Sequence, residues 1–274
     1  MTSDIHLIDF IARGFLFFTH GGLIILLITI GYLGFKRETF GKALYLLLFT
    51  MIFNAFLKAL WQIPRPDNFQ PGFHHSGWAF PSGHMQTASV LWGYFALEFR
   101  NKYFWAFVLI LLTGIAFGLI HFHYHVLRDI VGAVLIGGFT LILYYYVLKI
   151  AFFQKYLSSL GLILAILSAP LLLVFQSFPS SVPLAEGGLI GFSLGWISQE
   201  KFKKTEKTLS YRTPKTVLSI LVGLIGIIII RTLFFKYSSQ PISSLTIFFA
   251  YFLLSFWISG IASIITDKFF NRTN

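Results

Sequence analysis

Long apolar runs separated by short polar connections make up most of this chain. A helix needs about 20 residues to cross the hydrocarbon core of a bilayer. Runs of that length lie near residues 14–34, 43–62, 103–121, 128–149, 157–176, 216–235 and 243–266. Two shorter runs, 84–99 and 185–199, have charged or polar residues at both ends and are also expected to span. The pattern predicts an all-α fold, a polytopic membrane helix bundle of about nine transmembrane helices, unless residues 3–13 form an interfacial helix that changes the count.

The composition agrees with a membrane protein and narrows the choice of partners. Hydrophobic residues make up 56% of the chain and charged residues 11%, and the mean hydropathy of +0.77 lies far outside soluble globular usage. The net charge of +11 would suggest nucleic acid in a soluble protein. Here the basic residues lie in short loops, so no nucleic-acid partner is expected. The absence of cysteine excludes disulfides and thiol chemistry, and no signal-peptide cleavage pattern follows the first apolar run.

The distribution of lysine and arginine among the loops predicts the orientation. Alternate loops carry most of these residues, and the positive-inside rule places such loops in the cytoplasm. The cytoplasmic set is Lys36, Arg37, Lys42, Arg100, Lys102, Lys149, Lys155, Lys201, Lys203, Lys204, Lys207, Arg212, Lys215, Lys268 and Arg272. The polar stretches at 58–84 and 121–129 then face the exterior or the periplasm. We expect the protein to lie in a cell membrane, specifically a bacterial inner membrane.

A boundary is predicted near residue 155, because chemically active residue types cluster only before it. Residues 1–155 are expected to form a membrane core with motifs at 58–66, 81–84 and 118–129, and residues 156–274 to add further transmembrane helices. In the second part, a face of small residues is expected to let another helix pack closely. An acidic residue beside this face is expected to be solvated at the outer boundary. The acidic residue is Glu186, and the small residues are Gly187, Gly188, Gly191 and Gly195.

The first motif places two cations on a stiffened backbone. Lys58 ends an apolar run, and Arg65 follows seven residues later between Pro64 and Pro66. The lysine ammonium is a compact charge and the arginine guanidinium is a bidentate fork, so the pair suits a phosphate. Alternatively, the two cations extend to lipid headgroups, as basic residues beside membrane helices do.

The second motif, Pro81-Ser82-Gly83-His84, directly precedes an apolar run. Ser82 and Gly83 are therefore expected at a helix N-terminus, where unpaired backbone N–H groups favour an anion. His84 in this position could donate to a phosphate oxygen or protonate a leaving alkoxide. A simple capping turn is the alternative for this motif on its own.

The third motif joins an imidazole to a carboxylate. His125 and Asp129 are four residues apart, so they share one face of a helical turn. The carboxylate would accept a hydrogen bond from Nδ1 and leave Nε2 to attack phosphorus, following the orienting logic of a catalytic triad. A buried structural His–Asp pair is the alternative.

The three motifs resemble the type 2 phosphatidic acid phosphatase family of membrane lipid phosphatases, whose pattern is Lys-x6-Arg-Pro, Pro-Ser-Gly-His and Ser-Arg-x5-His-x3-Asp. The resemblance covers about residues 40–150 and implies a six-helix-type phosphatase core followed by extra C-terminal helices. It also implies a metal-independent phosphatase without a cofactor, acting on a lipid phosphate or diphosphate that enters from the bilayer. In this family His125 would be the nucleophile that forms a phosphohistidine, Asp129 its partner and His84 the general acid. The phosphate would be held by Lys58, Arg65, Ser82 and the backbone of Gly83.

The chain departs from the family pattern in one place. Gly118 and Leu119 stand where the family has Ser and Arg. A charge-assisted hydrogen bond of the kind that such an arginine makes contributes roughly 1.5–3 kcal/mol. His121 or His123 is favoured as a partial replacement, and Arg128 is a further candidate.

Other functions remain open on the sequence alone. The chain could be a lipid-binding or transport relative with impaired catalysis, or a lipid phosphotransferase that uses the same residues. A metal hydrolase is a further alternative, because a zinc ion could be bound by His121, His123, His125 and Asp129. The motifs favour no single lipid phosphate and no oligomeric state.

Overall fold

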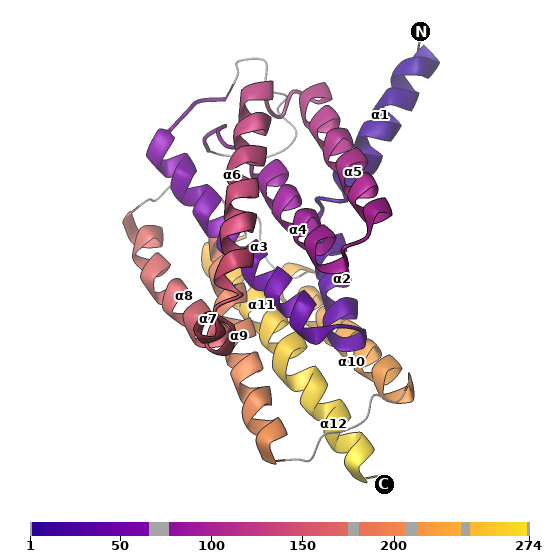
Figure 1. The fold of residues 1–274 in the computed structure, drawn as a ribbon, viewed down its shortest axis with the longest axis vertical. Coiled ribbons are helices and arrows are strands. Elements are labelled where there is room, and N and C mark those ends of the chain that lie inside the picture. The colour runs from indigo at the N-terminus through magenta and orange to yellow at the C-terminus, as the bar shows by residue number, and fades with distance from the viewer. Residues whose placement is uncertain (1, 66–76, 175–180, 206–212, 237–241, 273–274) are drawn as a thin grey trace. The chain divides into compact units, whose positions relative to one another are not determined.

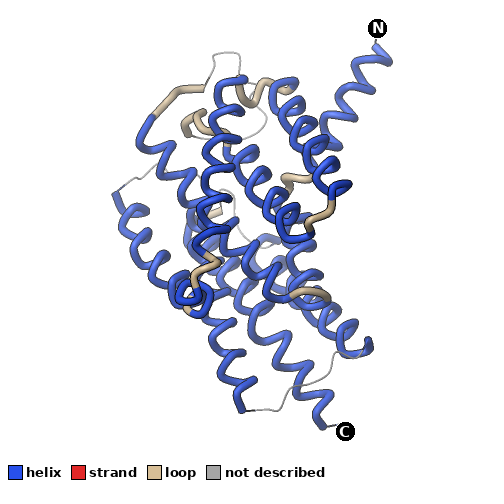
Figure 2. The backbone as a smooth tube through the Cα atoms, in the orientation of Figure 1, coloured by secondary structure: helices blue, strands red, loops and turns tan. Residues whose placement is uncertain are grey.

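The computed structural model describes residues 2–65, 77–174, 181–205, 213–236 and 242–272. Every regular element in this part of the chain is a helix (Figure 2), which confirms the all-α prediction. The chain divides into two compact units. The first is built mainly from Met1–Ile25 and Phe49–Leu148, and the second from Leu26–Leu48, Lys149–Gln176 and Ser180–Asn274.

In the first unit, the helix α4 lies at the centre. It packs against both α5 and α6, while α1 packs against α5 (Figure 1). Large side chains on α4 such as Tyr94 and Phe95 are fully buried, so this helix forms the core of the unit. The helices are α1 (Thr2–Phe17), the second half of α3 (Arg37–Trp61), α4 (Gly83–Phe99), α5 (Lys102–His121) and α6 (Leu127–Val147).

The second unit contains the remaining helices, and α9 packs there against α8 and α11. A Cβ atom on Gly187 or Gly191 of α9 would lie 2.2 or 2.1 Å from a backbone carbonyl oxygen of α11, which confirms the predicted close packing. The elements are the larger part of α2 (Gly21–Gly34), the first half of α3, α7 (Ala151–Lys155), α8 (Leu157–Val174), α9 (Ser181–Thr205), α10 (Thr213–Arg231), η1 (Thr232–Lys236), α11 (Ser244–Phe256), η2 (Trp257–Ile261) and α12 (Ala262–Arg272).

The solvent exposure of Glu186 differs from the prediction. We expected a solvated carboxylate, but Glu186 is only 2% exposed. The glycines that follow Glu186 let α11 pack closely on α9, and Glu186 lies in this buried part of the helix.

The polytopic membrane architecture is confirmed. By length and composition, five helices of the described chain could cross a membrane, and a bent pair, His6–Phe17 with Gly21–Gly34, would make a sixth. The five are Arg37–Trp61, Lys102–His121, Leu127–Val147, Pro214–Lys236 and Ser244–Thr266. The sequence predicts the two shorter spans at α4 and α9, but these helices are not among those long and apolar enough to cross a membrane.

The predicted span at 14–34 is not one continuous helix. It is interrupted between α1 and α2, where Thr19 Oγ1 donates to the carbonyl oxygen of Leu16 at 2.7 Å. His20 Nδ1 accepts a hydrogen bond from the backbone N–H of Gly22 at 3.2 Å. Polar side chains that bond the local backbone compete with the helix, and the glycine pair that follows has low helix propensity.

The contact between α1 and α5 depends on a glycine and can be tested. A Cβ atom at Gly118 would lie 2.9 Å from Leu16 Cγ and 3.0 Å from the backbone oxygen of Ala12. We therefore expect Gly118→Ala to force α1 away from α5 and to lower the free energy of unfolding by about 1–3 kcal/mol. Thermal unfolding of the purified protein in detergent measures this change.

The matched control is Gly138→Ala in α6, where a Cβ atom would meet nothing within 4 Å. Alanine is the better helix former, so this control is expected to be neutral or to stabilise the protein by up to about 1 kcal/mol. Equal effects of the two substitutions would contradict a specific α1–α5 contact at Gly118.

Candidate active site

A buried histidine and aspartate meet at the start of α6. Asp129 lies in the first turn of this helix, and its Oδ2 lies 3.3 Å from Nδ1 of His125 and 3.4 Å from the backbone N–H of Val126. His125 is 5% exposed and Asp129 is fully buried. The predicted i, i+4 contact is therefore present. With the proton of the ring on Nδ1, Nε2 carries the lone pair.

The second motif lies directly beside this pair. The backbone N–H of Ser82 donates to the carbonyl oxygen of Asp129 at 3.1 Å. Ser82 is the N-cap of α4, and its Oγ accepts from the backbone N–H of Met85 at 3.4 Å. The predicted helix N-terminus is thus confirmed, and Gly83 and half-buried His84 form its first turn. The motif that contains His84 is therefore joined through the backbone to the motif that contains His125.

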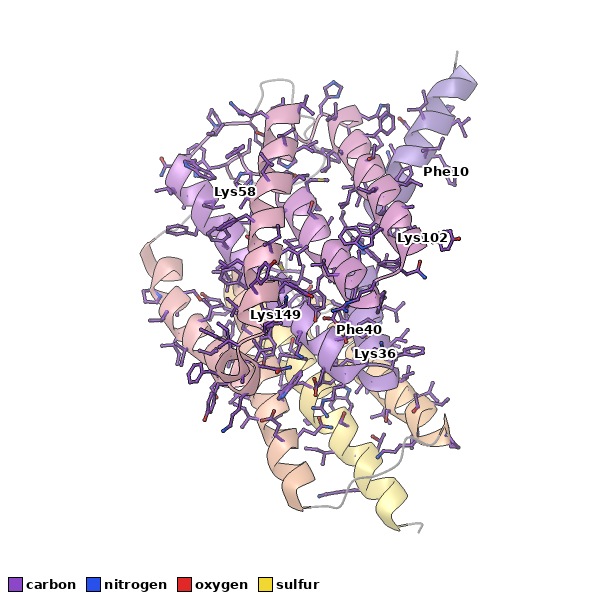
Figure 3. All side chains as sticks on the ribbon, in the orientation of Figure 1. Phe10, Lys36, Phe40, Lys58, Lys102 and Lys149 are labelled. Atoms are coloured by element: carbon purple, nitrogen blue, oxygen red, sulfur yellow. The ribbon has the colours of Figure 1, made fainter. Side chains whose placement is uncertain are left out.

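The two cations of the first motif bind the backbone around this site. Lys58 lies in the last turn of α3 (Figure 3), and its Nζ donates to the carbonyl oxygens of Trp78 and Ala79. Arg65 donates from Nε to Gly77 O at 3.2 Å and from Nη1 to Tyr124 O at 3.0 Å. Arg65 thereby links the segment after α3 to the residue next to His125. Pro66, the last residue of the motif, lies outside the described residues.

Charges from the first and third motifs act on His125. Burial is the main cause that lowers the pKa of this imidazole, and the positive charges of Lys58 and Arg65 lower it further. The hydrogen bond with Asp129 and the negative charge of Asp129 oppose this effect. Burial also lowers the pKa of Arg65, again with Asp129 opposing. The lowered pKa favours the neutral ring, which is the form in which an imidazole acts as a nucleophile.

The proposed replacements for the missing arginine lie around the α5–α6 connection. His121 Nε2 lies 2.7 Å from Asp9 Oδ1 on α1, so this ring is engaged by a carboxylate. His123 is exposed, and its backbone φ of 55° is in the left-handed region. The guanidinium of Arg128 is 60% exposed and approaches Asp129 Oδ1 at 3.5 Å. Of the three, Arg128 is the one whose contact reaches the buried pair directly.

The structure also shows contacts that the sequence analysis missed. The helix α1 approaches the α5–α6 connection, with Asp9 on His121 and with the guanidinium carbon of Arg13 5.2 Å from the ring centre of Phe122. In α3, Asn54 bonds the backbone at Pro81. Asn54 is a polar residue within an apolar run, which is a signal for function. No comparable signal marks the contacts of α1, because they depend on how distant helices pack.

The effect of Asp129 on His125 gives a direct test. We expect the pKa of His125 to lie below 6.5, and to fall further in Asp129→Asn, because the aspartate raises it through both its hydrogen bond and its charge. A histidine titration by NMR of the purified protein measures both values, and the signal that is lost in His125→Ala assigns the resonance.

The control is Asp9→Asn, which removes the carboxylate beside His121 and is expected to leave the titration of His125 unchanged. A rise in the pKa of His125 in Asp129→Asn would contradict the described pairing.

The lowered pKa of His125 also makes the stability of the fold depend on pH. With the folded pKa below 6.5, the unfolded chain binds more protons between that value and 6.5. The stability contributed by His125 therefore rises with pH across this window.

Comparison with known protein families agrees with the three motifs. The model of the PAP2 superfamily matches residues 40–153, and the model described as PAP2 superfamily phosphatase, transmembrane extension, matches residues 184–271. No match was found among the curated proteins or among the solved structures. All three motifs lie within the first match, and most of the second unit lies within the second. The chain therefore belongs to the PAP2 superfamily of membrane phosphatases and carries the transmembrane extension of that superfamily.

Proposed function

We propose that the protein hydrolyses a lipid phosphate or diphosphate through a phosphohistidine intermediate at the extracytoplasmic face of the membrane. One observation carries this proposal. Nδ1 of His125 lies 3.3 Å from Oδ2 of buried Asp129, and the imidazole lies within the electrostatic influence of Lys58 and Arg65. A nucleophile beside two cations is the arrangement that attack on a phosphate dianion requires.

The phosphate would be bound by the cations and by the first turn of α4. Nζ of Lys58 has three protons and gives two of them to the carbonyl oxygens of Trp78 and Ala79. Among the contacts that the structure describes, this leaves a third proton that would serve a substrate oxygen. The backbone N–H groups at Gly83 and His84 lie at a helix N-terminus, which favours an anion. Arg65 adds a second positive charge from a different segment of the chain.

Catalysis would proceed in two steps. In the first, Nε2 of His125 attacks phosphorus, the Nε2–P bond forms, and the bond from phosphorus to the lipid oxygen breaks. The leaving oxygen takes the electron pair and a proton from His84. In the second, His84 accepts a proton from water, whose oxygen attacks phosphorus, and the Nε2–P bond breaks to release phosphate. Asp129 stabilises the positively charged ring that is present while the N–P bond exists.

The surroundings of the site support a lipid substrate and an outward orientation. Val126 and Leu127 expose apolar side chains directly beside His125, where a lipid chain could lie. The site lies at the His121 end of α5, whereas the basic residues of the α4–α5 loop lie at the Lys102 end. A helix of 20 residues separates these ends by about 30 Å. By the positive-inside rule, this separation supports an orientation with Lys102 in the cytoplasm and His125 outside.

A panel of phosphorylated lipids tests this proposal. The purified protein in detergent is expected to release inorganic phosphate from at least one lipid mono- or diphosphate. His125→Ala is expected to reduce the rate about 10³-fold or more, because the covalent step is lost. An alkali-stable, acid-labile phosphoprotein should form on brief incubation with substrate.

The control for this panel is His6→Ala, which removes an exposed histidine from α1 and is expected to retain full activity. Undiminished phosphate release by His125→Ala would overturn the mechanism. Transfer of phosphate to an added lipid alcohol in preference to water would instead identify a phosphotransferase.

Chelation tests the metal-independent part of the proposal. Within the described part of the chain, no three histidine, aspartate or glutamate side chains form a group that could hold a metal ion. Extended incubation with a chelator, followed by its removal, is therefore expected to leave phosphate release unchanged. Loss of activity that added zinc restores would favour the metal hydrolase.

A further inference from the structure

We infer that Asn54 is a positioning residue that holds the phosphate-binding turn at the start of α4 in register with His125. The inference rests on the proposed phosphatase function and deepens it. Asn54 belongs to none of the three motifs, and it would act through the backbone rather than by touching the substrate.

The side chain of Asn54 joins α3 to the turn that begins α4. Its Nδ2 donates to the carbonyl oxygen of Pro81 at 3.2 Å and to Oε1 of Gln86 at 2.8 Å. Its Oδ1 lies beside Gly83, because a Cβ atom built on that glycine would be 3.2 Å away. Asn54 is 6% exposed. The amide thus contacts the residues on both sides of Ser82, which is the N-cap of α4.

Asn54 and Lys58 both donate hydrogen bonds to the same segment of chain. They are four residues apart on α3, so they project from one face of this helix. Lys58 holds the carbonyl oxygens of Trp78 and Ala79, and Asn54 holds that of Pro81. One helix face therefore fixes three carbonyl groups in the residues that lead into the anion-binding turn.

The position of that turn determines how the substrate meets the nucleophile. The turn is also tied to α6, since Ser82 N–H donates to Asp129 O. Without Asn54 the turn keeps the bond to α6 but loses its nearest anchor on α3. Catalytic groups must be placed closely, and a displacement of about 1 Å can reduce a rate about 100-fold.

Two substitutions separate positioning from simple packing. Asn54→Ala removes the hydrogen bonds to both Pro81 and Gln86, whereas Gln86→Leu removes only the bond between the two side chains. Both sites are buried, so both variants are expected to lower the melting temperature. The measurements are kcat/KM for phosphate release and the Kd of inorganic phosphate, obtained from its effect on the NMR signal of His125.

Positioning predicts that Asn54→Ala lowers kcat/KM about 10- to 100-fold and weakens phosphate binding, while Gln86→Leu changes both by less than about threefold. Equal losses in the two variants, each following the loss of stability, would overturn the inference. If Asn54→Ala does not fold, Asn54→Asp takes its place, since it keeps the shape and replaces the donor to Pro81 with an acceptor. The phosphate-binding readout is independent of turnover.

The failure of this inference can be told apart from failure of the proposed function. If wild-type protein releases phosphate and His125→Ala does not, the function stands whatever the Asn54 variants do. If wild-type protein binds inorganic phosphate at His125 without any turnover, the binding comparison still decides the role of Asn54.

Discussion

The site depends on one buried carboxylate, that of Asp129. An uncompensated charge in a protein interior is costly, so it has to be paired and hydrogen-bonded. Asp129 is paired on every side that the structure describes: with the ring of His125, with the backbone N–H of Val126 and with the guanidinium of Arg128. Its own carbonyl oxygen accepts from Ser82. The buried charge is therefore satisfied within the third motif, and the backbone of the same residue joins this motif to the second one.

The two cations of the first motif supply the positive charge of the site, and the backbone holds them in place. Lys58 and Arg65 both donate to backbone carbonyl oxygens. A carbonyl group positions a cation without neutralising it, so the positive charge remains available to an anion. Burial is the main cause that lowers the pKa of His125, and the charges of Lys58 and Arg65 lower it further. Electrostatic preorganisation of this kind requires a fixed backbone, which is the physical reason why a neutral amide such as Asn54 matters beside charged groups.

Sequence reasoning succeeded where the controlling interactions are local. The contact of His125 with Asp129 follows from their spacing, and the N-cap at Ser82 follows from a capping residue directly before an apolar run. The same reasoning failed for the single span at 14–34. This stretch is apolar overall, so the short polar break within it was not recognised as the end of a helix. It also did not find Asp9 as the partner of His121, since these residues are 112 positions apart. Contacts that depend on the packing of distant helices have no local pattern.

The packing of α1 also gives a physical context for the departure in the third motif. The chain has Gly118 and Leu119 where the family pattern has Ser and Arg. Gly118 is in the contact with α1, where a Cβ atom would approach the backbone oxygen of Ala12 to 3.0 Å. Leu119 is 1% exposed, so a cation here would have to be desolvated and paired. Both departures therefore lie at closely packed positions of α5, where neither a serine side chain nor an arginine would fit without rearrangement. In the proposed function, the positive charge for the substrate would come from Lys58, Arg65 and the N-terminus of α4.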